Sequence, residues 1–311
     1  MKTAFLFPGQ GAQLVGMGAE IAQSFPAAAE IYKKADDTVG YELSKICFEG
    51  PAEKLNTTTI SQPAIFATSA AILEVLRTEA PDKSTPDVTA GLSLGEYTAL
   101  LAAGLLGFED GLRLVQERGR AMQAAADASK GTMVSVIGLD AEKLNQLCQQ
   151  ARQDQVLSAV NFNCPGQIVV SGDIDACVRA EQLAEEFGAI KAVRLEVAGA
   201  FHTEMMQPAA DALKQAIDNT RIAEPATTAT IANINAEYYQ SAAEIAQGLV
   251  KQLTSPILWQ KSMERLLADG VANFIEIGPG RVLTALFRRI NRKTKVVNLS
   301  TLESLSKFLQ S

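Results

Sequence analysis

The chain has 311 residues, 47% of them hydrophobic, which is enough to bury a large core. Its 28 lysines and arginines and 35 aspartates and glutamates give a formal net charge of −7, so its composition does not support general binding to nucleic acid or to an anionic membrane. No two of the four cysteines stand at C-x-x-C spacing, and a single histidine cannot complete a usual zinc set. We expect a soluble cytoplasmic protein with no metal, whose cysteines are reduced and mostly buried: Cys47, Cys148, Cys164 and Cys177.

Short apolar runs with the length of strands alternate with helical segments along most of the chain. Such alternation is typical of an α/β domain with a largely parallel sheet. The runs that we expect to form strands cover residues 3–7, the segment around Val88, and residues 228–232, 273–277 and 295–299.

The middle of the chain follows a different order, that of a ferredoxin-like β-α-β-β-α-β unit. Gly188 lies where the second helix of this unit would end. We therefore predict a large domain made of residues 1–128 and 198–311 and a ferredoxin-like inserted domain made of residues 129–197. The elements expected in the insert are strands 132–138, 157–162, 167–171 and 192–197 and helices 140–151 and 174–187.

Residues 91–95 read Gly-Leu-Ser-Leu-Gly, which matches the G-x-S-x-G pattern of a nucleophile elbow centred on Ser93. A β-compatible run precedes the motif, and a helix-prone run over residues 96–103 follows it. The glycines suit the sharp turn, because a Cβ would obstruct its close backbone approaches. The pentapeptide alone is weak, since a chain of this length contains one by chance roughly one time in ten.

A serine nucleophile needs a base, and His202 is the only histidine in the chain. An isolated histidine is often a core or surface residue without chemistry, but the elbow at Ser93 favours the catalytic interpretation. No acid for a triad is evident, because Asp140 and either Asp173 or Asp175 are expected to be helix N-caps within the insert. We therefore expect a Ser–His dyad, oriented by a backbone carbonyl and suited to thioesters, at the cleft between the two domains.

Residues 5–13 form a predicted strand that runs into a glycine-bearing loop. Leu14 replaces the third glycine of G-x-G-x-x-G, and Met17-Gly18 replaces the Lys-Ser/Thr of a Walker motif, so neither nucleotide-binding pattern fits. What remains is a loop whose backbone N–H groups can approach an oxyanion, with the N–H of Leu94 as a second donor.

Six motifs occur in order from the first strand to near the C-terminus. They are Phe7-Pro8-Gly9-Gln10-Gly11, Gly91-Leu92-Ser93-Leu94-Gly95-Glu96-Tyr97, Glu117-Arg118-Gly119, Asn161-Phe162-Asn163-Cys164-Pro165-Gly166-Gln167, Gly199-Ala200-Phe201-His202 and Glu276-Ile277-Gly278-Pro279-Gly280. Together they resemble malonyl-CoA:acyl carrier protein transacylases. The resemblance implies an α/β-hydrolase-like large domain with a ferredoxin-like insert. It also implies a ping-pong transfer of malonyl from coenzyme A to the serine of the elbow and then to the phosphopantetheine thiol of a carrier protein, with no cofactor.

Carried over position by position, the resemblance makes Ser93 the nucleophile and His202 the general base and then the general acid. The backbone N–H groups of Gln10 and Leu94 would form the oxyanion hole. Gln252 matches the position whose backbone carbonyl orients the histidine.

The resemblance also assigns Arg118 to the malonyl carboxylate, which a planar guanidinium can grip bidentately. Pattern alone favours a solvated Arg118 on a helix over residues 112–122, or one paired with Glu117, and the resemblance reverses this preference. Phe201 is similar to the pattern of malonyl-selective members, although an extra methyl group is usually worth only about 1–3 kcal/mol of discrimination. Leu92 departs from the family, because many relatives have histidine there; we expect this change to affect packing beneath the nucleophile and not catalysis.

A basic cluster lies near the C-terminus of this acidic chain: Arg288, Arg289, Arg292, Lys293 and Lys295. It fits a docking site for an acidic carrier protein or for coenzyme A phosphates. The pattern favours the alternative of a solvated helix end whose cations interact with the C-terminal dipole.

We therefore predict a malonyl-CoA:acyl carrier protein S-malonyltransferase of fatty-acid synthesis. It would act as a monomer on a coenzyme A thioester and an acyl carrier protein, without contact to nucleic acid or membrane. A free-standing acyltransferase of a polyketide assembly line uses the same residues and stays open. A hydrolase that clears acyl groups from carrier proteins is disfavoured by Arg118, and a non-catalytic scaffold is disfavoured by the presence of both Ser93 and His202.

Overall fold

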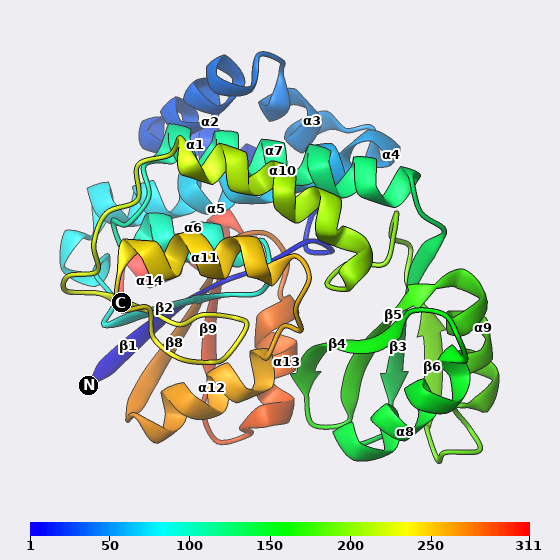
Figure 1. Cartoon of the computed structure of the whole chain (residues 1–311). Coiled ribbons are helices and arrows are strands. Elements are labelled where there is room, and N and C mark those ends of the chain that lie inside the picture. The colour runs from blue at the N-terminus through cyan, green and yellow to red at the C-terminus, as the bar shows by residue number, and fades with distance from the viewer.

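The structure is a computed structural model that describes residues 1–311, and it contains two separate sheets (Figure 1). The strands of the larger sheet are β1 (Lys2–Phe7), β2 (Val88–Gly91), β7 (Ala229–Thr230), β8 (Val271–Ile277) and β9 (Val296–Leu299). All neighbouring strands run parallel, in the order β7-β2-β1-β8-β9. The predicted α/β class with a parallel sheet is confirmed.

Strand β1 lies at the centre of this sheet, and its side chains alternate between two buried clusters. Phe5 and Phe7 join the main hydrophobic core, whereas Ala4 and Leu6 join a smaller cluster on the opposite face. Both faces are covered, which explains why the strand is almost wholly apolar. Its last residue, Phe7, lies in register with Gly91 at the end of β2, so the loops that follow β1 and β2 leave the sheet side by side.

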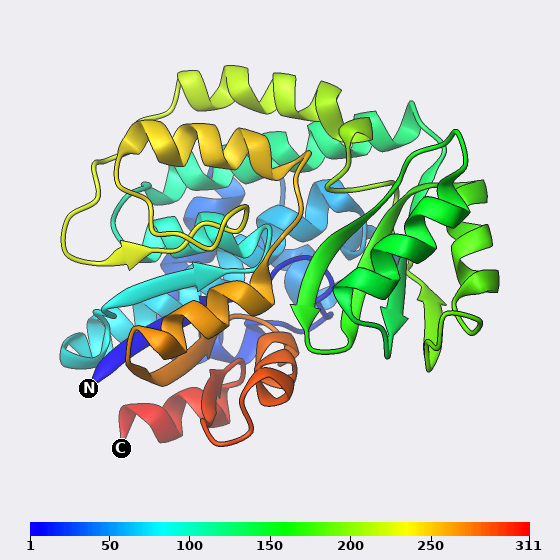
Figure 2. The same cartoon turned by 60° about the horizontal axis from the view of Figure 1, so that its bottom comes forward.

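Helices cover both faces of the large sheet (Figures 1 and 2). One face packs against α12 (Trp259–Ala268) and α13 (Val282–Ile290). The other face and its surroundings carry α1 (Ala19–Ser24), α2 (Pro26–Val39), α3 (Leu43–Glu49), α4 (Ala52–Leu55), α5 (Thr58–Glu79), α6 (Gly95–Ala102), α7 (Phe108–Asp127), α10 (Gln207–Asp218), α11 (Ala242–Gln252) and α14 (Leu302–Leu309).

Helix α5 has the length and composition of a membrane span. Most of its residues are buried among the other helices of the large domain, and it packs closely against α2 and α7. The length and apolar composition of this helix therefore match its central position in the core, where almost every side chain contacts protein.

The smaller sheet consists of β3 (Gly131–Ile137), β4 (Leu157–Cys164), β5 (Gln167–Asp173) and β6 (Lys191–Arg194). It is antiparallel, in the order β4-β5-β3-β6, and α8 (Ala141–Arg152) and α9 (Ile174–Leu183) share one buried cluster with it. This is the predicted ferredoxin-like arrangement, and Figure 1 shows it beside the large domain. The exact limits of the insert, residues 129 and 197, stay a prediction.

Several local details of the insert differ from the sequence-based expectation. Helix α9 ends at Leu183 instead of residue 187, and a turn then leads to Gly188, whose φ of 89° suits glycine. The Asp140 carboxylate caps α8 by accepting from the N–H of Lys143, as expected. Asp173 stands at the N-cap position of α9, but its carboxylate accepts from the N–H of Val156, so it ties the end of β5 to the loop before β4 and caps no helix.

The insert contacts the large domain through buried side chains and backbone hydrogen bonds, in addition to the two chain segments that connect them. Met133, Val160 and Val169, on the face of the small sheet opposite its helices, join the main core. Ile257 of the large domain forms a parallel bridge with β4, exchanging backbone hydrogen bonds with Val160 and Phe162 at 2.7 and 2.9 Å. The four cysteines are free and buried, as expected.

Candidate active site

Ser93 occupies a strained turn between β2 and α6. Its φ of 52° lies in the left-handed region, which residues with a Cβ seldom adopt. A Cβ at Gly91 would collide with the backbone of Gly95, and a Cβ at Gly95 would collide with the carbonyl of Phe7. The two motif glycines therefore let the elbow press against the end of β1, and the predicted nucleophile elbow is present.

The serine and the histidine are in direct contact. Ser93 Oγ lies 2.9 Å from His202 Nε2, and His202 Nδ1 lies 2.8 Å from the backbone carbonyl oxygen of Gln252. Because a carbonyl only accepts, Nδ1 carries the proton and Nε2 is left as the acceptor for the serine hydroxyl. The imidazole has no carboxylate partner. The structure thus brings together both residues of the expected dyad and the Gln252 carbonyl, and their catalytic roles stay a prediction.

Burial keeps this imidazole neutral. Burial and, to a smaller extent, the charge of Arg118 lower the pKa of His202, the Gln252 carbonyl opposes both effects, and the net result is a pKa of about 4. The histidine is therefore a free base throughout the neutral pH range. His202 also has a positive φ, 63°, so both members of the dyad adopt strained backbone conformations.

The loop that follows β1 lies against the elbow. A Cβ at Gly9 would collide with the Leu92 carbonyl and would lie 3.8 Å from the backbone nitrogen of Leu94. Neither the N–H of Leu94 nor that of Gln10 donates a hydrogen bond within the protein. Two free donors on adjacent loops beside the serine are what an oxyanion hole requires, so the position of both residues is consistent with that prediction.

Arg118 is not on the surface, although sequence pattern alone allowed that interpretation. It lies in the middle of α7 with 1% of its surface exposed, and Glu117 pairs with Arg120 instead, at 3.1 Å. One terminal nitrogen of Arg118 lies 2.9 Å from Ser93 Oγ and 2.9 Å from Gln252 Oε1. The other lies 2.8 Å from Gln62 Oε1, and Nε has no partner. A buried cation with only neutral partners thus adjoins the nucleophile.

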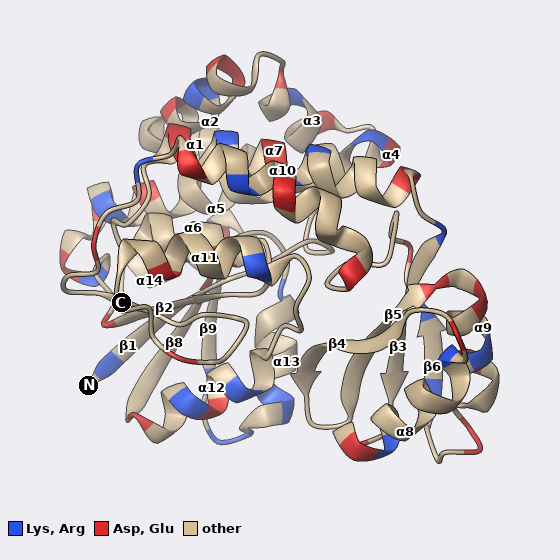
Figure 3. Ribbon diagram, viewed as in Figure 1, with Lys and Arg blue, Asp and Glu red and all other residues tan.

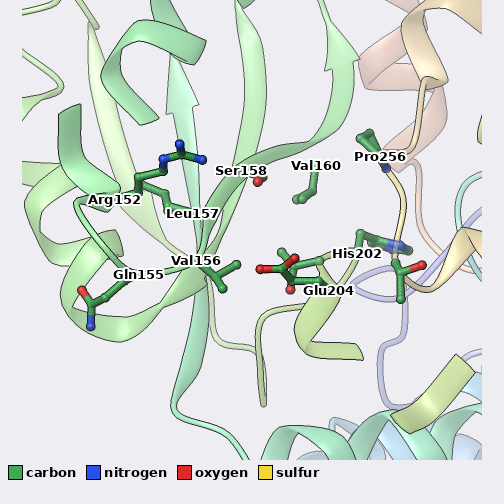
Figure 4. A pocket seen from close by; sticks show the side chains of 11 residues that line it. Arg152, Gln155, Val156, Leu157, Ser158, Val160, His202, Glu204 and Pro256 are labelled. Carbon is green, nitrogen blue, oxygen red and sulfur yellow. The ribbon is translucent and has the colours of Figure 1, made fainter. Parts of the chain in front are cut away.

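A cavity of about 290 Å³ opens beside His202, between the two domains. Figure 4 shows that side chains of β4, among them Ser158 and Val160, and side chains of the large domain, Glu204 and Pro256, line the same space. A ligand entering here would meet the dyad from the side of the insert. The structure holds no group of three or more His, Cys, Asp or Glu side chains that is arranged to bind a metal.

Comparison with known proteins agrees with this geometry. The family model described as "Acyl transferase domain" matches residues 4–307. The chain belongs to the acyl transferase family. It is 43% identical to the malonyl CoA-acyl carrier protein transacylase of Bacillus subtilis (strain 168), covering 100% of this chain and 97% of that protein. It is 41% identical to the enzyme of the same name from Escherichia coli (strain K12), covering 92% of each.

Solved structures of such acyl transferases share the whole fold. One is a malonyl-transacylase described in complex with a type II polyketide acyl-carrier protein; it has a TM-score of 0.96 and 38% identity, covering 100% of this chain and 99% of that one. Another is an acyl carrier protein S-malonyltransferase from Vibrio cholerae, with a TM-score of 0.94 and 39% identity, covering 99% and 100%. The resemblance inferred from the six motifs is confirmed.

Two further residues of this acyl transferase were singled out in the sequence. Phe201 is buried in the main core next to the histidine, and its role in selectivity stays a prediction. Leu92 packs against the smaller cluster beneath the large sheet, which contains Ala4 and Leu6. Its side chain therefore contributes to packing there, and the effect of having leucine in place of the common histidine stays a prediction.

Four buried polar residues of the acyl transferase site were not found by sequence analysis: Gln62, Glu96, Asn233 and Tyr239. Asn233 holds the elbow directly, because its Oδ1 accepts from the N–H of Ser93 at 2.6 Å and its Nδ2 donates to the carbonyl of Gly91 at 2.7 Å. The sequence contained one indication that Glu96 has a role: it is the only residue with a carboxyl group on the mostly apolar helix α6. The other three residues carry no comparable mark in the sequence.

One member of the basic cluster, Arg289, is hydrogen-bonded to the insert. The guanidinium of Arg289 donates to Gln167 Oε1 at 2.9 Å and to the carbonyl of Pro165 at 3.1 Å, so this side chain ties α13 to the β4–β5 turn of the insert. That residue is not simply a solvated cation at a helix end. Figure 3 shows Lys and Arg gathered on α12, α13 and the segment before β9, and docking of an acidic partner there stays a prediction.

Proposed function

We propose that this acyl transferase moves a malonyl group from coenzyme A to the phosphopantetheine thiol of an acyl carrier protein through an ester on Ser93. The observation that carries the proposal is the buried guanidinium of Arg118, 2.9 Å from Ser93 Oγ and without an acidic partner. A cation in that position suits an acyl group that ends in a carboxylate. The relatives named malonyl CoA-acyl carrier protein transacylase support the same substrates.

In the first half-reaction, His202 Nε2 takes the proton of Ser93 as Oγ attacks the thioester carbonyl. The oxyanion that forms can accept from the free N–H groups of Gln10 and Leu94. When the intermediate collapses, the bond to sulfur breaks, coenzyme A leaves and the imidazolium returns its proton to the departing sulfur. The product is the malonyl ester of Ser93.

In the second half-reaction, the carrier-protein thiol enters in place of coenzyme A. His202 takes the thiol proton, the sulfur attacks the ester carbonyl, and the proton passes to Ser93 Oγ as the ester bond breaks. Once acylated, Oγ is a poorer hydrogen-bond acceptor, so the Arg118 nitrogen that now bonds to it becomes free for the malonyl carboxylate. Arg118 thereby disfavours acyl groups that lack a carboxylate.

We propose further that the protein acts in the cytoplasm as a monomer, without cofactor, nucleic acid or membrane. Fatty-acid synthesis is the first candidate pathway, and a polyketide assembly line is the second, supported by the likeness to a malonyl-transacylase whose described partner is a type II polyketide carrier protein. Both pathways require the same transfer. Carrier proteins of the two pathways, compared as acceptors, would separate them.

Intact-protein mass spectrometry tests the transfer. The protein is mixed briefly with malonyl-, methylmalonyl- or acetyl-CoA, with Ser93→Ala as the control, and a carrier protein is then added. We expect a malonyl-sized adduct that requires Ser93 and that moves to the carrier. Free coenzyme A without carrier loading would identify a hydrolase, and the absence of both adduct and free coenzyme A would identify a scaffold.

A further inference from the structure

Glu96 is an ionisable group at the centre of the site that the proposed reaction does not use. Its side chain is fully buried, and no cation forms a salt bridge with it. Three neutral donors from distant segments surround it: the Tyr239 hydroxyl at 2.6 Å, Gln252 Nε2 at 2.5 Å and the N–H of Asn233 at 3.4 Å. A buried carboxylate costs free energy, so its partners indicate what it does.

Gln252 connects Glu96 to Ser93, Arg118 and His202. Its Nε2 donates to Glu96 and to the carbonyl of Ser93, at 3.0 Å, while its Oε1 accepts from Arg118 and its backbone carbonyl accepts from His202. The side-chain amide has only one orientation that fits, because a carboxylate accepts and a guanidinium only donates. Reversing the amide would set an NH₂ group against Arg118 and an oxygen against Glu96.

Glu96 is also the acidic group that balances the buried cation. Arg118 has only neutral hydrogen-bond partners, and the charge of Glu96 raises the pKa of this guanidinium while burial lowers it. Burial raises the pKa of Glu96, its three donors and Arg118 oppose that rise, and the net result is a pKa of about 7. The two opposite charges are therefore separated by one amide group, that of Gln252.

The ionisable groups around Glu96 come from every element packed on it. Tyr97 lies next to it on α6, Arg118 faces it from α7, and Tyr239 faces it from the segment before α11. Glu244 lies behind Tyr239 and adds a further negative charge. Burial raises the pKa of Tyr97 and that of Tyr239, so among the acidic groups in contact with the site only the Glu96 carboxyl changes charge near neutral pH.

We propose that Glu96 is a positioning residue for the transfer reaction: its carboxylate fixes the side chain of Gln252, and Gln252 in turn holds Arg118 and His202. The inference rests on the proposed malonyl transfer. It assigns two tasks to one carboxylate, since Arg118 acts on the malonyl group alone whereas His202 acts on any acyl group.

Two variants test the proposal in the acyl-loading half-reaction, with malonyl-CoA and acetyl-CoA as substrates. Glu96→Met removes both acceptors at similar length, and we expect kcat/KM for malonyl loading to fall by about 10- to 100-fold, with a smaller fall for acetyl loading. Glu96→Gln can still accept from Gln252 through its amide oxygen while its NH₂ group donates to the rotatable Tyr239 hydroxyl. We expect this conservative variant to restore most of the loading rate.

Glu276→Met is the matched control. Glu276 is likewise fully buried, but it accepts from α13 and β9 and touches no residue of the site. We expect it to lower the melting temperature while the malonyl-to-acetyl ratio of loading stays that of the wild type. A Glu96→Met protein that is folded by circular dichroism and keeps the wild-type ratio and rate would overturn the proposal.

The pH profile keeps the proposal testable if Glu96→Met does not fold. We expect wild-type kcat/KM for malonyl loading to decrease as the pH falls through about 7, because protonation removes the charged partner of Gln252. Glu96→Gln should lack that step and show the same loading rate on both sides of pH 7. Superimposable profiles would overturn the proposal. A wild-type protein that never loads malonyl would instead contradict the proposed function.

Discussion

Two buried polar clusters of the large domain, one around Glu276 and one around Ser93, differ in whether their hydrogen-bonding groups are satisfied. Around Glu276, the carboxylate accepts from the N–H groups of Leu283 and Thr284, from the Thr284 hydroxyl and from Asn298 Nδ2, so its acceptors are filled by the protein. Around Ser93, the backbone N–H groups of Gln10 and Leu94 and the Nε of Arg118 donate to nothing.

The two clusters also differ in backbone strain, which is present only around Ser93. Ser93 and His202 both have positive φ, at 52° and 63°, whereas Glu276 lies in a regular strand. A cluster that serves stability satisfies its groups, because each buried unpaired group costs about 1–3 kcal/mol. A cluster that serves a ligand keeps donors free and tolerates strain. This contrast identifies the site independently of any relative.

The largest effect that distinguishes the two clusters should come from removing the nucleophile. Ser93→Ala should lower acyl loading by at least about 10³-fold, because no other hydroxyl is hydrogen-bonded to His202. Loss of the acyl adduct in intact-protein mass spectra measures the effect. Ser129→Ala, which alters only a hydroxyl bonded to the carbonyl of Ala125, is the control and should load normally. Equal loading by the two variants would show that the elbow is not the acylated site.

Removing the unpaired cation should change selectivity. Arg118→Ala should reduce malonyl loading by about 10- to 100-fold and relatively favour acetyl, because the charge-assisted bonds to the carboxylate are lost. Competition between malonyl-CoA and acetyl-CoA measures the ratio. Arg120→Ala lies two residues away on the same helix, is exposed, and should leave the ratio unchanged. If Arg118→Ala kept the malonyl preference, the carboxylate would bind elsewhere.

The neutral imidazole should shift the acid limit of the reaction. In Glu96→Gln, where the carboxyl no longer titrates, acetyl loading should fall only as the pH drops through about 4, since protonated His202 cannot take the serine proton. A limit near the ordinary value of 6.5 would contradict the buried, neutral histidine.

The lowered pKa of His202 also affects the stability of the fold. Between pH 6.5 and about 4 the unfolded chain binds a proton at His202 that the folded chain does not, so the free energy of unfolding should decrease as the pH falls, by up to about 3 kcal/mol. Urea unfolding at several pH values, compared with His202→Gln, isolates this contribution. A difference between the two proteins that does not vary with pH would contradict it.

The smallest expected effect on activity comes from the satisfied cluster. Glu276→Gln places an NH₂ group among donors and should lower the free energy of unfolding by about 1–3 kcal/mol, while loading per folded molecule is unchanged. Denaturant titration and mass spectrometry on the same preparation measure both quantities. A selective loss of malonyl loading would remove the distinction between the two clusters.

Local sequence determined the elbow and the order of elements. The glycines around Ser93 specify a turn that only they permit, and the period of the apolar residues specifies strands and helices, so these features depend on neighbours along the chain. The end of α9 and the partner of Asp173 were predicted wrongly, because a helix end and the bonding of an aspartate also depend on which loops pack nearby.

Tertiary structure alone determined which polar groups of the site are buried and which of them hydrogen-bond to one another. In the sequence Arg118 is one cation on an amphipathic helix, and nothing local distinguishes it from Arg120; the packing of α7 against α5 buries one and exposes the other. Glu96 and Gln252 are 156 residues apart and meet only because α6 and α11 converge behind the serine. Burial and the choice of hydrogen-bond partner are set by contacts between distant segments, which a linear pattern does not encode.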